Sequence, residues 1–145
     1  MKEKVNMNIT YTNTISVEDC DKLRNSAGWT QMHHKQIEAG LKNSAYIVAA
    51  KDGDKTVGMA RLVSDGGYVV FIVDVLVLPE YQRNGIGRNM MKQLMEHIYS
   101  MLDDGYCIQV DLMAAKDKES FYEEFGFTKR PNESYGCGFT QRIRR

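Results

Sequence analysis

The chain has 145 residues, of which 43% are hydrophobic, and its 19 basic and 19 acidic residues balance to a net charge of zero. This length and apolar content suit one ordinary domain with a packed core, so a single domain over residues 1–145 is expected. Nucleic-acid binders and membrane-surface proteins usually need a basic excess, which this chain lacks. The expected partner is therefore a small molecule, with neither nucleic acid nor membrane involved.

The N-terminus and the cysteines both predict a cytoplasmic location. Residues 1–8 lack the apolar stretch of a signal peptide, and no segment is long and charge-free enough to span a bilayer. Cys20, Cys107 and Cys137 lie far apart and form no Cys-x-x-Cys pair, which suits a reducing compartment. No cluster of cysteine, histidine and carboxylate residues has zinc-ligand spacing, so no metal site is expected.

The first half of the chain reads as strands with two helices near its start. A helix is expected to begin near Val17, because Ser16 is a good N-cap residue and acidic residues follow it. The run from Tyr68 to Leu78 is apolar except for Asp74, which predicts a central strand covered on both faces. The remaining elements expected here are strands at 7–11, 46–50 and 56–63 and a helix at 32–41.

The second half predicts a strand-helix-strand-helix unit. Apolar residues recur at helical spacing from Gly87 to Leu102, and Asp104-Gly105 closes this helix. Further elements are expected as strands at 107–113, 127–129 and 139–143 and as a short helix at 118–125. An antiparallel meander followed by such a unit predicts an α+β fold with a mixed, mostly antiparallel sheet.

The most informative segment runs from Val77 to Arg88, between the apolar strand and the amphipathic helix. Gly85 and Gly87 carry no side chains, so backbone N–H groups can converge on an anion there, and the helix that follows adds the positive end of its dipole. The segment has neither the Gly-x-Gly-x-x-Gly of dinucleotide folds nor the Gly-Lys-Ser/Thr of nucleoside-triphosphate loops. It therefore predicts a phosphate cradle of another kind, the alternative being an ordinary turn from strand to helix.

This segment resembles the signature of the GNAT N-acetyltransferase superfamily, Gln/Arg-x-x-Gly-x-Gly/Ala, which Gln82, Gly85 and Gly87 match. The resemblance implies a sheet with helices on both faces and acetyl-coenzyme A as co-substrate. It also implies that the loop backbone wraps the pyrophosphate of coenzyme A, with two arginines adding charge. The cofactor-binding loop residues are then Gln82, Arg83, Asn84, Gly85, Ile86, Gly87 and Arg88.

A second motif strengthens the resemblance. Residues 121–127 are similar to the Tyr-x-x-x-Gly-Phe element of the family, with Tyr122 at the tyrosine position. The likeness covers the chain from about residue 46 to residue 127, about 35 residues separating the two motifs. Many relatives carry an asparagine about seven residues before that tyrosine, where this chain has Ala115, so the pantetheine contact made by that asparagine is not expected here.

The resemblance also suggests how acetyl transfer would be catalysed. Pantetheine is expected to pair with the edge of the fourth strand at Val75, Leu76 and Val77, where an N–H would face the thioester oxygen. Tyr122 is the candidate proton donor to the departing thiolate, because a free tyrosine titrates near about 10 and stays protonated at neutral pH. The alternative for Tyr122 is a packed helix aromatic.

The general base is less clearly marked. Phe71 and Val73 occupy strand positions at which some relatives carry Glu or His, and neither side chain can take a proton. Asp74 is the lone charge of the apolar strand, which costs energy unless it is hydrogen-bonded or used. Two interpretations of Asp74 stay open, a structural hydrogen-bonding role and a role on the substrate side, and water could also relay the proton.

The acceptor is expected to be the primary amine of a small molecule. Trp29 lies in the region that forms the acceptor wall in this superfamily, so it is the candidate substrate-binding residue, with a packing role as the alternative. Two other functions remain open, a protein or peptide N-acetyltransferase and a non-catalytic acetyl-coenzyme A sensor. Dimers are common among small relatives, which makes a homodimer the expected assembly.

Overall fold

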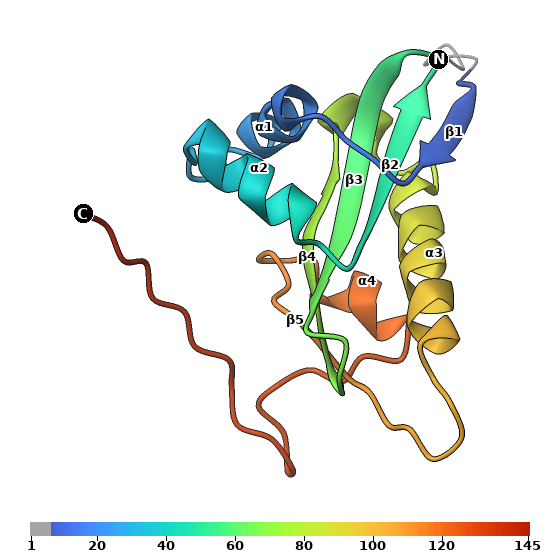
Figure 1. The fold of residues 1–145 in the computed structure, drawn as a ribbon, viewed down its shortest axis with the longest axis vertical. Coiled ribbons are helices and arrows are strands. Elements are labelled where there is room, and N and C mark those ends of the chain that lie inside the picture. The colour runs from blue at the N-terminus through green and yellow to red at the C-terminus, as the bar shows by residue number, and fades with distance from the viewer. Residues whose placement is uncertain (1–6) are drawn as a thin grey trace. The chain divides into compact units, whose positions relative to one another are not determined.

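The computed structural model describes residues 7–145 (Figure 1). The chain divides into two compact units, Met1–Asp111 and Leu112–Arg145, which are described separately below. That the whole chain forms a single domain stays a prediction. The strand expected at 7–11 lies within the described residues as Ile9–Thr12.

A five-stranded mixed sheet forms the centre of the first unit, and its strands are neighbours in sequence order. The first four strands pair antiparallel, and β5 follows β4 in the sheet. Short turns at Gly53 and Gly66, both with positive φ, allow the chain to reverse between β2 and β3 and between β3 and β4. The strands are β1 (Ile9–Thr12), β2 (Tyr46–Asp52), β3 (Lys55–Ser64), β4 (Val69–Val77) and β5 (Gln109–Leu112).

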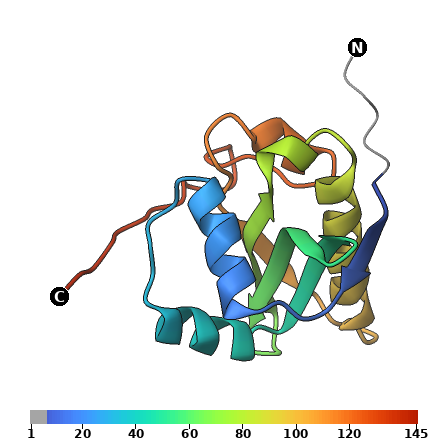
Figure 2. The ribbon, with the colours of Figure 1, turned by 90° about the horizontal axis from the view of Figure 1, so that it is seen from above.

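Helices cover both faces of this sheet. Figure 2 shows α1 (Val17–Ser26) and α2 (His34–Lys42) on one face and α3 (Ile86–Ser100) on the other. The start of α1 is as predicted, because the Ser16 hydroxyl accepts a hydrogen bond of 3.1 Å from the backbone N–H of Asp19. The α+β architecture with helices on both faces is confirmed.

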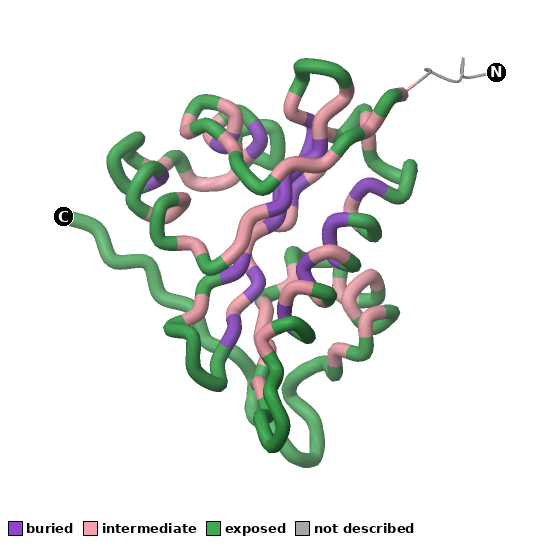
Figure 3. The backbone as a smooth tube through the Cα atoms, turned by 45° about the vertical axis from the view of Figure 1, so that its right-hand side comes forward, coloured by how far each residue is buried: buried purple, intermediate pink, exposed green. Residues whose placement is uncertain are grey.

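The core has two apolar layers, one on each face of the sheet, as the buried segments in Figure 3 indicate. The helical spacing predicted from the sequence places one side of α3 against the sheet, with Met90, Met91, Leu94 and Ile98 buried. On the other face, the side chains of α1 and α2 pack against β3 and β4 in a cluster of Cys20, Leu23, Ile37, Met59 and Leu76.

Strand β4 contains a β-bulge, which the sequence pattern did not predict. Arg61 of β3 pairs with Val73 and Met59 pairs with Leu76, so two β4 residues, Asp74 and Val75, lie opposite one β3 residue. Asp74 adopts φ +53°, a conformation that is uncommon outside glycine. The bulge turns the Asp74 side chain toward the face that α1 and α2 cover.

The prediction that this strand lies inside the sheet and is covered on both faces is confirmed, because β3 and β5 flank it and helices α1 and α3 contact it from opposite sides. The middle strand is β3, and β4 is the fourth of five. Along β4, Val70, Ile72 and Leu76 are buried, whereas the residues between them are only half-buried. Ile72 is buried on the α3 side and Leu76 under α1 and α2, so the continuous apolar run indicated a strand with buried residues on both faces.

The second unit contains one short helix, α4 (Glu119–Glu123), close to the helix predicted at 118–125. The strands predicted at 127–129 and 139–143 are absent, because both segments lack strand pairing. Phe139 and Ile143 are 89% and 85% exposed, so the apolar alternation that suggested a strand buries nothing here. Alternation specifies a strand only when a neighbouring edge and an apolar face are available to it.

Gly58 provides a test of the packing between β3 and α3. A Cβ at this position would lie 3.0 Å from the Leu76 carbonyl oxygen and 3.2 Å from Met90 Cε. Because the nearest atom is backbone, Gly58→Ala is expected to lower the free energy of unfolding by about 1–3 kcal/mol. Urea denaturation of the purified protein measures this change.

Gly40→Ala is the matched control for that substitution. Gly40 is helical, and its new Cβ would meet no atom closer than Arg61 Nη2 at 3.7 Å, an ordinary contact. Alanine in a helix restricts the unfolded chain, so this variant should be more stable by about 0.4–1 kcal/mol. Equal stabilities for the two variants would contradict the tight packing at Gly58.

Candidate active site

The loop between β4 and α3 has a backbone suited to an anion. A short 3₁₀ turn, Pro79–Tyr81, leads into it, and two of its residues adopt left-handed conformations, Arg83 at φ +64° and Gly85 at φ +79°. Left-handed residues alternating with others point successive N–H groups into one concavity. A non-glycine residue at positive φ costs about 1–3 kcal/mol, so the surrounding structure must hold Arg83 in place.

Side chains of the loop itself hold this backbone. Gln82 Nε2 donates to the Val77 carbonyl at 3.0 Å. Asn84 Nδ2 donates to the carbonyls of Tyr81 and Gln82, both at 3.0 Å. Gln82 and Asn84, which were predicted to bind the cofactor, are thus bonded to the chain through their side chains. A ligand at positions 82 and 84 would therefore contact mainly backbone groups, because the side-chain amides are already bonded within the loop.

The start of α3 supplies further donors. Gly85 is the N-cap, and the Asn89 N–H is bonded to the Gly85 carbonyl at 3.0 Å, so the N–H groups of Ile86, Gly87 and Arg88 precede the first intrahelical bond. A Cβ built on Gly85 would meet no atom within 4 Å, which shows open space beside the cradle. The buried Ile86 side chain anchors the helix end. The geometry therefore fits a phosphate group.

Tyr81 ties the loop to the turn between β2 and β3. Its hydroxyl donates to Asp52 Oδ2 at 2.8 Å, and this hydrogen bond is the main reason that the pKa of Tyr81 is raised. Lys55 Nζ lies 5.4 Å from the centre of the Tyr81 ring and 3.5 Å from Glu80 Oε1. Tyr81 was not predicted as a site residue, because its partners lie about 30 residues earlier, at the turn between β2 and β3.

The strand segment predicted to pair with pantetheine, residues 75–77, begins within the bulge. Leu76 is buried in the cluster under α1 and α2, while Val75 and Val77 are half-buried. A bulge leaves one residue outside the regular ladder, so the pairing of β4 with β3 is interrupted at this point. Binding of pantetheine to Val75, Leu76 and Val77 stays a prediction.

Asp74 is bound by two arginines from different elements. Its Oδ1 lies 3.1 Å from Arg24 Nη1 of α1, and its Oδ2 lies 2.6 Å from Arg61 Nε of β3. The three side chains are only 13%, 19% and 11% exposed for Arg24, Arg61 and Asp74. The hydrogen-bonded interpretation of Asp74 therefore matches the geometry, while a catalytic role stays a prediction.

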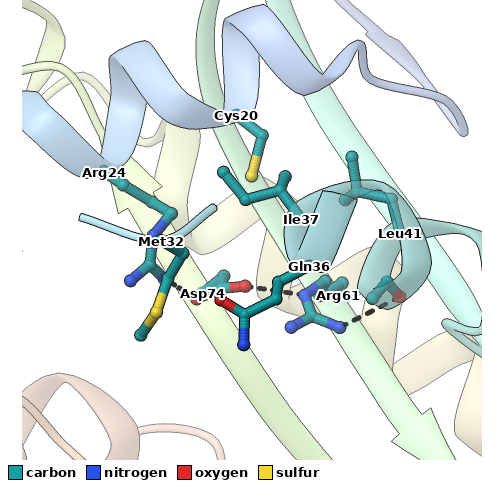
Figure 4. Close-up of a pocket in the computed structure, with 9 residues that line it drawn as sticks. Cys20, Arg24, Met32, Gln36, Ile37, Leu41, Arg61 and Asp74 are labelled. Carbon is teal, nitrogen blue, oxygen red and sulfur yellow. Dashed lines mark hydrogen bonds and ion pairs between the residues drawn. The ribbon is translucent and has the colours of Figure 1, made fainter. Parts of the chain in front are cut away.

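A cavity of about 160 Å³ lies beside this ion-pair cluster, between α1, α2, β3 and β4 (Figure 4). Figure 4 shows Arg24 and Arg61 approaching Asp74 from opposite sides. The two arginines were not predicted, although a lone aspartate in an apolar strand implied some cationic partner. The cavity is lined by Cys20, Arg24, Met32, Gln36, Ile37, Gly40, Leu41, Arg61 and Asp74.

Trp29 does not line that cavity but lies next to one of its residues. The Arg24 guanidinium carbon is 5.4 Å from the centre of the Trp29 ring, a cation–π arrangement. The indole also packs against the apolar cluster under α1 and α2. These contacts account for a packing role, and substrate binding by Trp29 stays a prediction.

Tyr122 lies on α4 in the second unit. Its ring makes edge-to-face contacts with Phe121 and Phe127, at centroid distances of 5.1 and 6.5 Å. Burial raises the pKa of Tyr122, so its hydroxyl holds its proton at neutral pH even more firmly than a free tyrosine does. This protonation state suits a proton donor, and the catalytic assignment stays a prediction.

No helix within residues 7–145 is long and apolar enough to cross a membrane. The same residues contain no group of three or more histidine, cysteine, aspartate or glutamate side chains that could hold a metal ion.

Comparison with known proteins agrees with this geometry. A family model described as an acetyltransferase (GNAT) domain matches residues 11–141. An uncharacterized N-acetyltransferase, ycf52, from Pyropia yezoensis is 32% identical over 128 residues, which cover 86% of this chain and 71% of that protein. The histone acetyltransferase TAP1 from Glycine max is 31% identical over 129 residues, covering 81% of this chain and 54% of TAP1, so the chain spans about half of that relative.

The fold agrees as well. The crystal structure of a protein from meticillin-resistant Staphylococcus aureus, described as a probable acetyltransferase of unknown function, superposes with a TM-score of 0.82 at 29% identity. The match covers 93% of this chain and 100% of that one. The chain therefore belongs to the GNAT acetyltransferase family and is an acetyl-coenzyme A-dependent N-acetyltransferase.

Proposed function

We propose that this enzyme transfers the acetyl group of acetyl-coenzyme A to the primary amine of a small molecule, with residues 82–88 holding the pyrophosphate. The observation that carries the proposal is the loop geometry, in which left-handed Arg83 and Gly85 lead into the backbone N–H groups of Ile86 and Gly87 at the start of α3. Backbone donors and the helix dipole act together on an anion there. The arginines at positions 83 and 88 would add charge.

The chain's own groups can meet the requirements of the reaction. The co-substrate supplies an acetyl thioester, whose carbonyl oxygen would accept from a β4 backbone N–H at the bulge. Tyr122 would then donate its proton to the sulfur as the carbon–sulfur bond breaks. The attacking amine must first be neutral, and water can carry away its proton. Asp74, already bonded to two arginines, would act on the substrate side by holding them in place.

The size of the cavity beside Asp74 favours a small acceptor. Its volume of about 160 Å³ is below the usual range for pockets that hold drug-sized ligands, which suits a small group rather than a peptide segment. The homodimer and the cytoplasmic location remain part of the proposal as expectations. Neither affects the chemistry proposed here.

A protein acceptor is the second candidate, because the relative TAP1 is named a histone acetyltransferase. A panel of small primary amines and a panel of lysine peptides, both assayed for released coenzyme A thiol, separate the two functions. We expect turnover with at least one free amine at a kcat/KM at least about tenfold above that of any peptide. Turnover confined to peptides would support the second candidate instead.

The loop assignment predicts stabilisation by the co-substrate. A ligand bound only by the folded state stabilises it by mass action, so saturating acetyl-coenzyme A at 100 times its Kd should add about 2.7 kcal/mol to the free energy of unfolding. Gly87→Glu should abolish the shift, because it brings negative charge to the cradle. Thermal melting with and without ligand measures both effects.

Gly87→Gln is the control for that variant, because glutamine has nearly the same size and no charge. We expect it to retain a larger share of the thermal shift than Gly87→Glu does. A full shift in a folded Gly87→Glu protein would mean that the pyrophosphate binds elsewhere.

Tyr122→Phe tests the proton donor. Phenylalanine keeps the edge-to-face packing with Phe121 and Phe127 but lacks the hydroxyl. The expected result is a kcat lower by about 100-fold or more with acetyl-coenzyme A binding nearly unchanged, the usual scale for loss of a general acid. Steady-state kinetics and a cofactor titration should be measured on the same folded preparation.

A purely structural role for Tyr122 predicts a different outcome. If kcat stays within about twofold of the parent while chemistry limits the parent rate, Tyr122 is a packed aromatic and another group is the acid.

A further inference from the structure

We propose that the cavity beside Asp74 binds a carboxylate of the acceptor, so that the substrate is an amine with a carboxylate at its other end. This inference rests on the proposed function, since it names the class of small amine that is acetylated. It depends on the charge balance of the cavity, on its unused donors and on its position beside the β4 bulge.

The cavity carries a net positive charge. Two guanidiniums, Arg24 and Arg61, face a single carboxylate, Asp74, and all three side chains are largely buried. Cys20 is neutral, because burial raises the pKa of its thiol. Asp21, the next acidic residue along α1, is not part of the lining; its Oδ2 contacts Asn25 and His34, while its Oδ1 is buried without a hydrogen-bond partner within the described chain. Among the lining side chains one positive charge therefore exceeds the negative charge, which disfavours an ammonium group and favours an anion.

Donors for that anion are present. Arg24 Nε is buried and has no hydrogen-bond partner within the described chain, whereas Nη1 and Nη2 are bonded to Asp74 and to the Thr30 carbonyl. A buried donor without a partner is unfavourable, so an acceptor atom at this position is expected to bind well. Gln36 uses its Oε1 to accept from the His33 N–H, which leaves its Nε2 amide as a second donor in the cavity wall.

The apolar walls of the cavity indicate which part of the substrate lies next to the carboxylate. Met32, Ile37 and Leu41 are apolar, so they suit a short aliphatic stem next to the anionic end. A single excess charge matches the single charge of a carboxylate better than the near-double charge of a phosphate. The planar guanidinium also fits the two coplanar oxygens of a carboxylate.

The cavity is also adjacent to the expected place of reaction. Asp74 directly precedes Val75 at the bulge, where the thioester oxygen would find its N–H donor. A carboxylate held by Arg24 and Arg61 would therefore leave the amine at the other end of the stem free to reach the β4 edge. The ion-pair cluster would position the acceptor without contacting the reacting atoms.

Matched acceptors test this class of substrate. We would compare 4-aminobutanoate with 4-aminobutanamide, 1,4-diaminobutane and 3-aminopropylphosphonate, and repeat the series with shorter and longer stems. Because a hydrogen bond between charged groups is the stronger kind, the best carboxylate should exceed its neutral amide by about tenfold or more in kcat/KM. Equal rates for carboxylate and amide at every length, or a preference for ammonium or phosphonate, would overturn the proposal.

Charge changes at Gln36 test the cavity itself. Gln36→Glu keeps the oxygen that accepts from His33 but adds a negative charge, and Gln36→Lys adds a positive one. The carboxylate-to-amide ratio should fall about threefold or more in the first variant and rise in the second. Gln93→Glu, on α3 across the sheet, is the matched control and should leave the ratio unchanged. A ratio that neither Gln36 variant moves would overturn the site.

A binding readout separates this inference from the proposed function. In an NMR titration with 4-aminobutanoate and its shorter and longer homologues, the Arg24 Nε–H resonance should shift saturably with at least one carboxylate and not with its amide. If no amine or peptide is ever acetylated but this shift occurs, the proposed function fails and the carboxylate site stands. Acetylation of amines without any shift at Arg24 would retain the function and remove the site.

Discussion

The bulge in β4 is the constraint on which the candidate site depends. In β3 and β4, Leu62 and Ile72 pair on the α3 side of the sheet, and strict alternation would place Asp74 on that same apolar side. The extra residue, with its positive φ, instead brings the carboxylate to Arg24 and Arg61. The bulge thus gives the buried Asp74 carboxylate its two arginine partners, and these three side chains form the charged wall of the cavity. It also interrupts the pairing of β3 with β4 next to the expected position of the thioester.

The loop between β4 and α3 likewise combines local backbone strain with support from other residues. The left-handed conformation of Arg83 is energetically unfavourable. It is maintained because the side chains of Gln82 and Asn84 hold the backbone around it. Tyr81 adds a connection to Asp52, which lies at the end of β2. The concavity is therefore preorganised, and a ligand binding there would not need to order the loop first.

Features that depend on residues close together in the sequence were predicted correctly, namely the helices and the turn that leads into α3. Ser16 at an N-cap, the helical spacing of Met90 and Leu94, and the loop glycines each act within a few residues, so the helices and the turn from β4 into α3 were predicted close to their observed positions. The strands expected at 127–129 and 139–143 failed because a strand needs a neighbouring edge, which no local pattern provides. Arg24 and Arg61 were missed for a related reason, since 50 and 13 residues separate them from Asp74.

The two ion pairs of Asp74 also affect how the substrate amine can lose its proton. Each carboxylate oxygen already accepts from a guanidinium, so a proton taken up there would have to weaken one of two nearly buried ion pairs. Breaking either pair would leave an uncompensated charge beside the cavity. A positioning role avoids this cost, because the cluster stays intact while the acceptor binds next to it. Proton removal is then best assigned to water at the reacting end of the substrate, away from the anionic end that the arginines would hold.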